Sequence, residues 1–417
     1  MKPIAIVLGG TVPHVQLIEK LKARGYYVVL ADYLDDPPAR LVADEHVKVS
    51  TLDKSAVLEL ARDRSAGLVI STCVDQANVT CCYVAERLGL PHPYSYETAL
   101  NVTDKVRMKD MMLKADIPTS AYIIVSDPEA VKTAGLKYPL MIKPADSNSA
   151  NGVHKAVDDA ELSSYFAEAI KFSRNGKVVV EEFVGGKEIS AYCVAVNGEV
   201  NVVMTQERLS VLDDPVCGGV KCFGSIAPAR LSSTARSNVK LIADKIAAAF
   251  NLANTPLFFQ GKVNGDDVSV IEFAARVGGG VSSRTICRGT GFDIIEAAID
   301  SFLGRKLSLE GWRPLSRWYA VNQIYGLSGI FDQVTGIEEL LDRHIVDKVD
   351  FYRAKGSEVD GGRASGGRVG VMHFSAENES DLRVRVREAF QSIDCLNNKG
   401  KSMLRRDLNI DNLWDAS

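Results

Sequence analysis

The sequence predicts an α/β protein of two or three domains, for three reasons. The chain has 417 residues, and a domain averages about 150 residues. Its first hundred residues alternate apolar strands with helical segments, which is typical of a parallel sheet. Farther along the chain, two strands are joined by a hairpin turn, which indicates antiparallel strands after the first domain.

Composition and charge exclude several classes of protein. Lys and Arg number 49 against 53 Asp and Glu, so bulk charge does not favour a nucleic-acid partner. The 46% hydrophobic content is too high for a disordered chain. No apolar run approaches the roughly 18 residues of a membrane span, so we expect no membrane partner. Eight cysteines without a CxxC pair are typical of reduced thiols, and we expect a cytoplasmic protein.

The first domain, expected over residues 1–100, is Rossmann-like. Short apolar strands alternate with helical segments, and the first strand ends at Gly9 and Gly10. A strand, a glycine turn, a helix and a strand form a βαβ unit with parallel strands. The expected elements are strands over 3–8, 26–31 and 67–71 and helices over 15–24 and 75–88.

The sequence favours a purely structural Rossmann-like layer here over a dinucleotide-binding site. Asp32 stands about where a ribose-binding acid would lie. However, residues 9–14 read Gly-Gly-Thr-Val-Pro-His, which is not GxGxxG, and Pro13 occupies a position of close backbone approach. A nicotinamide oxidoreductase stays an alternative that the absence of a thermal shift with NAD or NADP would exclude.

The pattern changes near residue 105. A basic helix is followed by strands, one of which ends in Lys143 before a loop of small residues. The later strands include a hairpin whose turn reads Asn-Gly-Asp-Asp over 264–267. Residues 205–232 have mixed polarity, and we assign them no element. The expected elements are helices over 105–115, 236–250 and 293–303 and strands over 122–125, 138–144, 178–184, 189–196, 257–263, 268–274 and 369–374.

The order of the charged residues matches the needs of phosphoryl transfer from ATP. Such a site needs cations for phosphates, a cover, groups for adenine, and oxygen ligands for magnesium. Lys143 ends a strand before a small-residue loop, and Glu181 begins an edge-like segment. Gln260 and Glu272 lie on facing strands of one hairpin, and Arg276 precedes three glycines.

Four segments in this order resemble the ATP-grasp superfamily of ATP-dependent ligases, over most of the chain. Residues 103–109 resemble the start of its ATP-binding domain, and 138–144 resemble its strand with a lysine. Residues 180–188 resemble its hinge, and 271–280 its metal-binding strand. The likeness is greatest to members with a Rossmann-like first domain, namely L-amino-acid ligases, biotin carboxylase and carbamoyl-phosphate synthetase domains.

The resemblance implies roles for the nucleotide-binding residues. Lys105 and Lys143 would neutralise ATP phosphates, with Lys109 as a competing candidate near Lys105. A loop over 146–152 would cover the phosphates through its N–H groups. The adenine edge would be held by one carboxylate and the hinge backbone, and the ribose by Glu188. The residues expected to contact ATP are Lys105, Lys143, Ser147, Ser149, Asn151, Gly152, Glu181, Glu182, Phe183, Val184 and Glu188.

The resemblance also implies metal and substrate residues. Gln260 and Glu272 would bind Mg²⁺ or Mn²⁺ between the phosphates. Arg276 would act as a catalytic residue with Lys143, by stabilising an acyl phosphate or holding a substrate carboxylate. The substrate would lie against Gly278, Gly279 and Gly280, with Arg284 as a second carboxylate candidate.

Three departures from the family pattern concern the metal and the cover loop. The family usually has Glu where Gln260 stands, although carbamoyl-phosphate synthetases also use Gln. It usually has Asn where Ala274 stands, which removes one oxygen ligand of a second metal. The cover loop carries Ser and Asn where glycines are common. These departures bear on the second metal and on turnover.

The expected protein is therefore an ATP-grasp carboxylate–amine ligase that forms an amide through an acyl phosphate. After the Rossmann-like domain we expect a two-lobed ATP-grasp α+β domain, with a small lobe over 101–185 and a large lobe over 186–310. A C-terminal α+β lobe would cover 311–417. ATP and Mg²⁺ (or Mn²⁺) are the expected cofactors, and a small carboxylate and an amine, both of amino-acid type, the expected substrates. A homodimer is the default oligomer.

Two further alternatives stay open. One is an enzyme that phosphorylates bicarbonate, as carbamoyl-phosphate synthetase and biotin carboxylase do, and Gln260 favours it slightly. The other is a nucleotide-binding protein with a weakened ATP-grasp site, which rests on Ala274.

Overall fold

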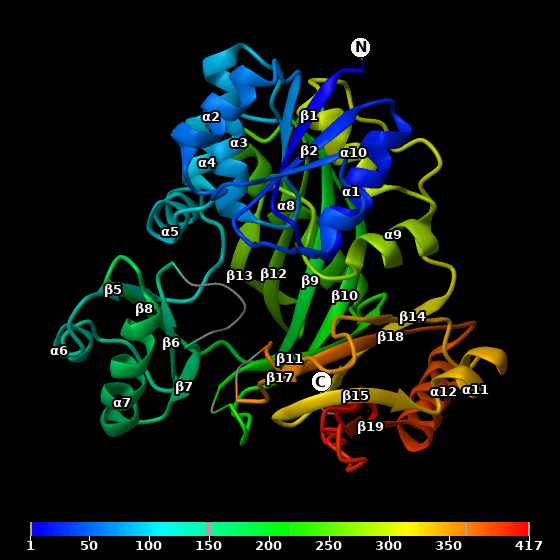
Figure 1. Ribbon diagram of the computed structural model, residues 1–417. Coiled ribbons are helices and arrows are strands. Elements are labelled where there is room, and N and C mark those ends of the chain that lie inside the picture. Colours follow the sequence, from blue (N-terminus) through cyan, green and yellow to red (C-terminus); the bar gives the residue numbers. More distant parts are fainter. Residues whose placement is uncertain (1, 147–151, 218, 363–364, 416–417) are drawn as a thin grey trace.

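The computed structural model describes residues 2–146, 152–217, 219–362 and 365–415. In that part of the chain the strands form four sheets, and helices connect and cover them (Figure 1). The N-terminal sheet lies at one end of the molecule, a small antiparallel sheet lies to one side, and a large sheet connects them (Figure 1). This mixed α/β architecture confirms the predicted fold class.

The first sheet is parallel, in the strand order β3-β2-β1-β4. Ile6 lies in the centre of the sheet, opposite Val29 on one side and Val69 on the other, and all three are buried. The Rossmann-like prediction is thus confirmed for this layer. Its elements are β1 (Ile4–Leu8), α1 (Val12–Ala23), β2 (Tyr27–Asp32), η1 (Pro38–Leu41), β3 (Glu45–Lys48), α2 (Lys54–Asp63), β4 (Leu68–Ile70) and α3 (Asp75–Leu88).

The second sheet is antiparallel, in the order β5-β8-β6-β7. Helix α7 packs on β6 through a small core that includes Leu162, Phe166 and Ile142. Met141 pairs with Glu181, so Lys143, two residues on, shares the face of that carboxylate. The elements of this region are α4 (Tyr96–Asn101), α5 (Lys105–Lys114), β5 (Tyr122–Val125), α6 (Glu129–Lys132), β6 (Leu140–Pro144), β7 (His154–Ala156), α7 (Asp159–Ala169), η2 (Ile170–Phe172) and β8 (Val178–Glu182).

The third sheet has eight strands, in the order β13-β12-β9-β10-β11-β14-β18-β16. It includes two long strands in the 199–227 region, where the sequence analysis assigned no element. Its strands and helices are β9 (Lys187–Val196), β10 (Glu199–Val211), β11 (Lys221–Ala227), α8 (Ser233–Ala249), β12 (Asn254–Asn264), β13 (Asp267–Ala274), α9 (Ser282–Thr290), α10 (Ile294–Phe302), β14 (Trp318–Tyr325), β16 (Lys348–Phe351) and β18 (Arg368–Ala376).

A three-stranded sheet in the order β17-β15-β19 completes the C-terminal part. The eight-stranded sheet contains strands from before and after residue 310. The predicted boundary between the large lobe and the C-terminal lobe therefore stays a prediction. The remaining elements are β15 (Gly329–Thr335), α11 (Ile337–Asp342), β17 (Glu358–Val359), α12 (Glu379–Ser392), β19 (Asp394–Asn397) and η3 (Ile410–Leu413).

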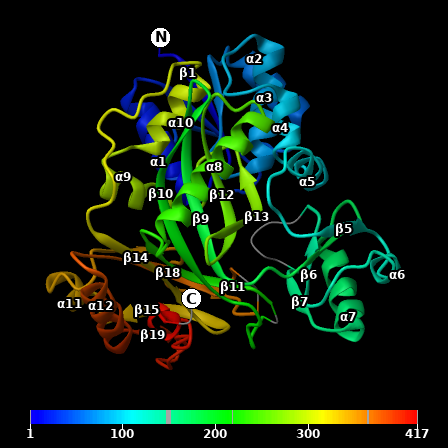
Figure 2. The same ribbon diagram turned by 180° about the vertical axis from the view of Figure 1, so that it is seen from behind.

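The two faces of the large sheet have different neighbours. Ile189, Ala191 and Cys193 of β9 belong to the core that contains the apolar face of α8, which lies across the sheet in the rear view (Figure 2). Tyr192 and Val194 alternate with them and pack in the core of the N-terminal sheet and α10. Since side chains alternate along a strand, the second face is the one turned toward the N-terminal domain.

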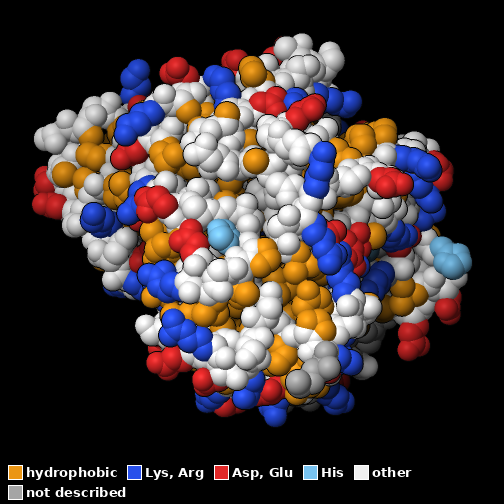
Figure 3. Space-filling model, turned by 90° about the horizontal axis from the view of Figure 1, so that it is seen from above, with side chains coloured by type: hydrophobic (Ala, Val, Ile, Leu, Met, Phe, Trp, Pro, Cys, Tyr) orange, Lys and Arg blue, Asp and Glu red, His pale blue; other side chains and the backbone are white. Residues whose placement is uncertain are grey.

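Lys and Arg side chains are interspersed with Asp and Glu on the face seen from above (Figure 3). Among the described residues, no helix combines the length and the hydrophobicity that a membrane span requires.

We expect Gly224→Ala to lower the midpoint of thermal unfolding, because β11 leaves no room for a Cβ atom there. A Cβ would overlap the Ile410 side chain and lie 2.9 Å from the Val321 carbonyl oxygen. Overpacking of this kind costs about 1–3 kcal/mol. The matched control is Gly67→Ala, whose Cβ would lie 4.0 Å from the Ile4 carbonyl. Equal unfolding midpoints for both variants would contradict this packing.

Candidate active site

Two lysines share one buried carboxylate where the small sheet meets the large one. Nζ of Lys109 lies 3.0 Å from Oε2 of Glu181, and Nζ of Lys143 pairs with Oε1 of the same side chain. The Ser120 hydroxyl donates to Oε2 at 2.7 Å. Glu181 and Lys109 are 3% and 5% exposed, so this charge cluster is inside the protein.

The backbone near Lys109 joins the small lobe to the large sheet. Lys109 donates to the Thr119 hydroxyl at 2.6 Å, and that hydroxyl donates to the Val270 carbonyl at 2.8 Å. The Val270 N–H donates to the Pro118 carbonyl at 2.7 Å. Helix α5, the strand containing Glu181 and the edge strand β13 are therefore fastened together at the lysine cluster.

Of the two candidate lysines on α5, Lys109 is the one in this cluster. Lys105 begins the helix, directly after the Asp104 side chain that caps it, and is partly exposed. Its charge still acts on Lys143, so it lies nearby. The role predicted for Lys105 stays a prediction, and Lys109 joins it as a candidate because helical spacing places it one turn deeper.

Burial changes the protonation of both lysines. Burial, together with the positive charge of Lys109, lowers the pKa of Lys143 to about 7. Burial also lowers the pKa of Lys109 to about 8, whereas the charge of Glu272 opposes the shift. Lys143 is therefore close to half-protonated at neutral pH, and a polyanion beside it would favour its charged form.

The hinge segment after β8 presents backbone groups beside an aromatic ring. The Phe183 N–H donates to the Pro139 carbonyl at 2.8 Å, and Glu182 accepts from the Lys137 N–H at 2.9 Å. Among the described residues nothing accepts the Val184 N–H. The Val184 N–H is therefore available for the predicted adenine contact, whereas both oxygens of Glu181 are already bound within the chain.

Part of the predicted cover loop falls outside the described residues, namely Ser147, Ser149 and Asn151. Gly152 is described and adopts φ +69°. A Cβ atom on it would lie 2.8 Å from the Phe172 ring, so both the backbone angle and the space favour glycine. Its predicted contact with phosphates stays a prediction.

The two predicted metal ligands lie directly opposite each other. Gln260 on β12 pairs with Glu272 on β13, and both side chains are partly exposed. On the other side, Gln260 pairs with Ser190, whose buried hydroxyl has no hydrogen-bond partner among the described residues. The described residues contain no cluster of three or more His, Cys, Asp or Glu side chains that could bind a metal alone.

Three charged side chains lie at the next paired position on the same face of the large sheet. Glu188 pairs with Arg208 at 2.7 Å, and Nζ of Lys262 lies 3.7 Å from its other oxygen. Burial alone would raise the pKa of Glu188, but Arg208 and Lys262 outweigh it and hold that pKa below its usual value. The sequence analysis missed both cations. The local sequence around Arg208 gave no clear signal, because Gln206, Glu207 and Arg208 are polar in succession rather than in alternation.

Arg276 is bound by an acid of the N-terminal domain. Its Nε and Nη2 atoms each lie 2.7 Å from an oxygen of Asp75, at the start of α3. Its Nη1 donates to the Val277 carbonyl at 2.9 Å, and the guanidinium lies 5.0 Å from the Phe258 ring centre. The structure thus gives the predicted catalytic arginine a bidentate partner within the chain.

The glycines after Arg276 lie against the N-terminal domain. A Cβ atom on Gly278 would overlap the Tyr192 ring, and the Cys73 thiol donates to the Gly278 carbonyl at 3.2 Å. Gly279 and Gly280 are exposed. Packing against Tyr192 therefore explains the glycine at 278, while a substrate contact at all three stays a prediction.

Arg284 also has an acidic partner. It projects from α9 and forms an ion pair with Asp350 of β16, which additionally binds Lys348 and His373. The side-chain oxygens of Asp32, the acid of the dinucleotide alternative, accept the N–H groups of Gly10 and Leu34. That carboxylate is therefore occupied by the adjacent loop.

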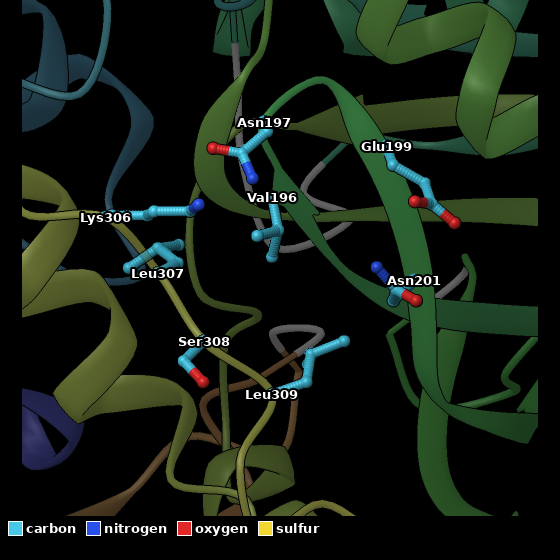
Figure 4. A pocket seen from close by; sticks show the side chains of 8 residues that line it. All are labelled: Val196, Asn197, Glu199, Asn201, Lys306, Leu307, Ser308 and Leu309. Atoms are coloured by element: carbon cyan, nitrogen blue, oxygen red, sulfur yellow. The ribbon is translucent and has the colours of Figure 1, made fainter.

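A separate hollow of about 450 Å³ lies at the opposite end of β9 (Figure 4). It is formed by the turn at Asn197, by Glu199 and Asn201 of β10, and by residues 306–309. Nine residues of strand separate its turn from Glu188, which is about 30 Å. It therefore lies outside the candidate site.

Comparison with known proteins gives a consistent result. The family described as the D-ala D-ala ligase C-terminus matches residues 111–217. A protein described as an L-arginine-specific L-amino acid ligase, from Bacillus subtilis, is 23% identical over 350 residues. That alignment covers 80% of this chain and 81% of the other.

Solved structures show the same fold. An L-amino acid ligase from Bacillus licheniformis has a TM-score of 0.80 at 21% identity, over 95% of this chain and 99% of the other. The biotin carboxylase domain of a 2-oxoglutarate carboxylase from Hydrogenobacter thermophilus, solved with MgADP, ADP and bicarbonate, has a TM-score of 0.74 at 17% identity. It covers 97% of this chain and 92% of the other.

We expect the chain to take up about one proton when it binds MgADP at pH 8. Lys143, with a pKa of about 7, is mostly neutral there, and the phosphates would raise its pKa and protonate it. Calorimetric titration in two buffers with different ionisation enthalpies measures this uptake, which should fall toward zero at pH 6. Lys143→Met should reduce the uptake, whereas the exposed Lys132→Met should not. Equal heats in the two buffers at pH 8 would contradict it.

Proposed function

We propose that the chain is a member of the ATP-grasp superfamily and acts as an ATP-dependent carboxylate–amine ligase. ATP would phosphorylate a substrate carboxylate, and an amine would then displace phosphate from the acyl carbon. The products would be an amide, ADP and phosphate. The observation that carries the proposal is the cluster of Lys109, Lys143 and Glu181 beside the facing pair Gln260 and Glu272.

The chain's own residues would contribute positioning and charge. Lys143 and Lys109 would hold the phosphates, while Glu181 keeps both ammonium groups in place. The Val184 N–H is suited to the adenine edge, whereas both oxygens of the Glu181 carboxylate are already bound by the two lysines and Ser120. ATP supplies the phosphoryl group and Mg²⁺ supplies charge compensation. Catalysis would then depend on orientation and electrostatics rather than on a protein nucleophile.

The donor set fits magnesium bound together with a nucleotide. Mg²⁺ is typically held by one or two carboxylates plus substrate phosphates and waters. Glu272 offers a carboxylate and Gln260 an amide oxygen on adjacent strands, which is too few for a cation without phosphates. Ala274, buried at 4% exposure, offers no further oxygen. We therefore place a nucleotide-linked metal between Gln260 and Glu272.

The substrates are best sought among amino acids. The Bacillus subtilis protein that matches four fifths of the chain is described as an amino acid ligase, and so is the Bacillus licheniformis structure. A bicarbonate-phosphorylating enzyme is the second candidate. Gln260 favours it, and so does the likeness to a biotin carboxylase domain solved with bicarbonate.

We expect Lys143→Ala and Glu272→Ala each to reduce substrate-dependent ADP release about 100-fold or more, since each removes a group that would stabilise transferring phosphate. The assay screens pairs of amino acids and other carboxylates, and mass spectrometry identifies the product. The controls are Lys132→Ala and Glu338→Gln, both at exposed helix positions. ADP release that survives in both site variants would refute the proposal.

Bicarbonate separates the two candidate functions in the same assay. ADP release with bicarbonate alone, without any amino acid, would favour the second candidate. Nucleotide binding without ADP release across the whole panel would favour a nucleotide-binding protein with a weakened site.

We expect Mn²⁺ to bind measurably only when ADP is present, because two side-chain oxygens form an incomplete site. Electron paramagnetic resonance of free Mn²⁺ measures the bound fraction with and without nucleotide. Glu272→Gln should weaken the ADP-linked binding, and Glu338→Gln should leave it unchanged. Tight Mn²⁺ binding to the protein alone would show that further ligands exist.

A further inference from the structure

The face that carries the nucleotide residues continues across the whole eight-stranded sheet. Arg208 of β10 pairs with Ser225 of β11, which pairs with Val321 of β14, which in turn pairs with His373 of β18. Side chains of paired residues lie on the same face of a sheet. Gln323, two residues after Val321, therefore shares this face.

Tyr352 and Arg368 lie close to each other, on the part of the sheet that follows β11 in the strand order. Tyr352 follows β16, donates its backbone N–H to the Val369 carbonyl at 2.8 Å, and lies beside Gln323 and Arg368. The Cys222 side chain lies near both Arg208 and Arg368. The two guanidinium groups thus flank one region of the sheet.

Three arginines at this face or its rim are neutralised by the chain itself. Arg208 binds Glu188, Arg276 binds Asp75, and Arg284 binds Asp350. Each of these pairs joins two different elements, so each has a structural role. A substrate carboxylate would have to compete with the bound acid at any of the three.

Arg368 has no such acid. Within the described ranges, no carboxylate oxygen lies within 4 Å of its guanidinium. Its Nε donates to the Tyr325 hydroxyl at 2.9 Å, and that hydroxyl donates to the Cys222 carbonyl at 3.1 Å. Tyr325 is 1% exposed, so the anchor is rigid. Nearby Asp350 is already bound by Arg284, Lys348 and His373.

This arrangement is suited to an incoming carboxylate. A partly buried guanidinium without a counter-ion loses hydration that only an anion restores. With Nε held by Tyr325, both terminal nitrogens of Arg368 remain for the two oxygens of a carboxylate. Beside it, the buried Gln323 side-chain oxygen has no hydrogen-bond partner in the described part of the chain; as an acceptor it suits an N–H group of the same ligand rather than its carboxylate. Tyr352 adds a hydroxyl with a pKa raised by burial to about 12, so it stays a donor.

We propose that Arg368, with the Tyr352 hydroxyl beside it, binds a substrate carboxylate that does not itself react with ATP. This inference rests on the proposed function, because it positions one end of a substrate whose other end reaches the nucleotide. Two sources share this chemistry. One is the α-carboxylate of an amino acid that supplies the amine, and the other is the second carboxylate of a dicarboxylic acid that is phosphorylated.

The test is calorimetric titration of the full chain, saturated with MgADP, with each of the twenty L-amino acids, their amides and succinate. We expect Arg368→Gln to weaken binding of the best carboxylate ligand about tenfold or more, as expected for the loss of a charged hydrogen bond. Its MgADP affinity should not change. The amide of that ligand should bind weakly to wild type and variant alike.

Tyr325→Phe should weaken the same ligand less, since it frees Nε and the Cys222 carbonyl but leaves both terminal nitrogens of Arg368 in place. The exposed Arg343→Gln is the matched control. Binding of amino acids but not succinate assigns the amine substrate, and the reverse assigns the acid. In turnover, Arg368→Gln should raise the KM of that substrate more than it lowers kcat.

Equal carboxylate binding by wild type and Arg368→Gln would overturn this inference, as would a wild type that binds no carboxylate. Its failure is distinguishable from failure of the ligase. Arg368-dependent binding without ADP release from any pair would refute the ligase and leave the subsite. ADP release with a KM unchanged in Arg368→Gln would refute the subsite and leave the ligase.

Discussion

The alternation of side chains along β9 is the constraint on which the rest of the structure depends. Its odd-numbered residues from Ile189 to Ala195 are buried against α8, so its even-numbered residues must face the other way. Toward its C-terminal end these are Tyr192 and Val194, which the N-terminal domain covers. Toward its beginning they are Glu188 and Ser190, which are polar. One strand therefore separates a covered apolar half of this face from a polar half suited to ligands.

The polar half is connected to the small lobe through one carboxylate. Glu181 is 3% exposed, and a buried charge of this kind needs partners. Lys109 comes from α5 and Lys143 from β6, so the ion pairs connect three elements at once. The same contact lowers the freedom of both ammonium groups and keeps them near Glu272. A structural requirement and a phosphate-binding geometry are satisfied by the same three side chains.

Local patterns in the sequence predicted most elements of the first two sheets and the hairpin of β12 and β13. The parallel strands of the first sheet are apolar runs, and Lys143, Glu181 and Glu272 are charges inside such runs, which makes them conspicuous. Strands β10 and β11 were not assigned because polar and apolar residues do not alternate regularly over 205–232: Gln206, Glu207 and Arg208, for example, are polar in succession. The elements after residue 310 were mostly missed because their pairing is long-range.

Side-chain partners were the part of the site that sequence could not supply. Arg276 and Asp75 are 201 residues apart, and no local pattern joins them. Likewise, helical spacing allowed both Lys105 and Lys109 to reach a phosphate site, and only the fold placed Lys109 against Glu181. Motif order predicts which residue types gather, whereas tertiary packing decides which of them already have a counter-ion.

Whether an arginine already has a counter-ion decides where a substrate carboxylate is expected to bind. The Arg276–Asp75 pair fixes the N-terminal domain against the loop that begins at Gly278, and the Cys73 thiol adds a second contact there. This loop is therefore positioned before any substrate arrives. Arg276 is already bound by Asp75. On the proposal made above, the non-reacting carboxylate of the substrate therefore binds a guanidinium that has no acidic partner in the chain. Such a group lies on β18, so a substrate would extend along the sheet away from the nucleotide rather than toward the N-terminal domain.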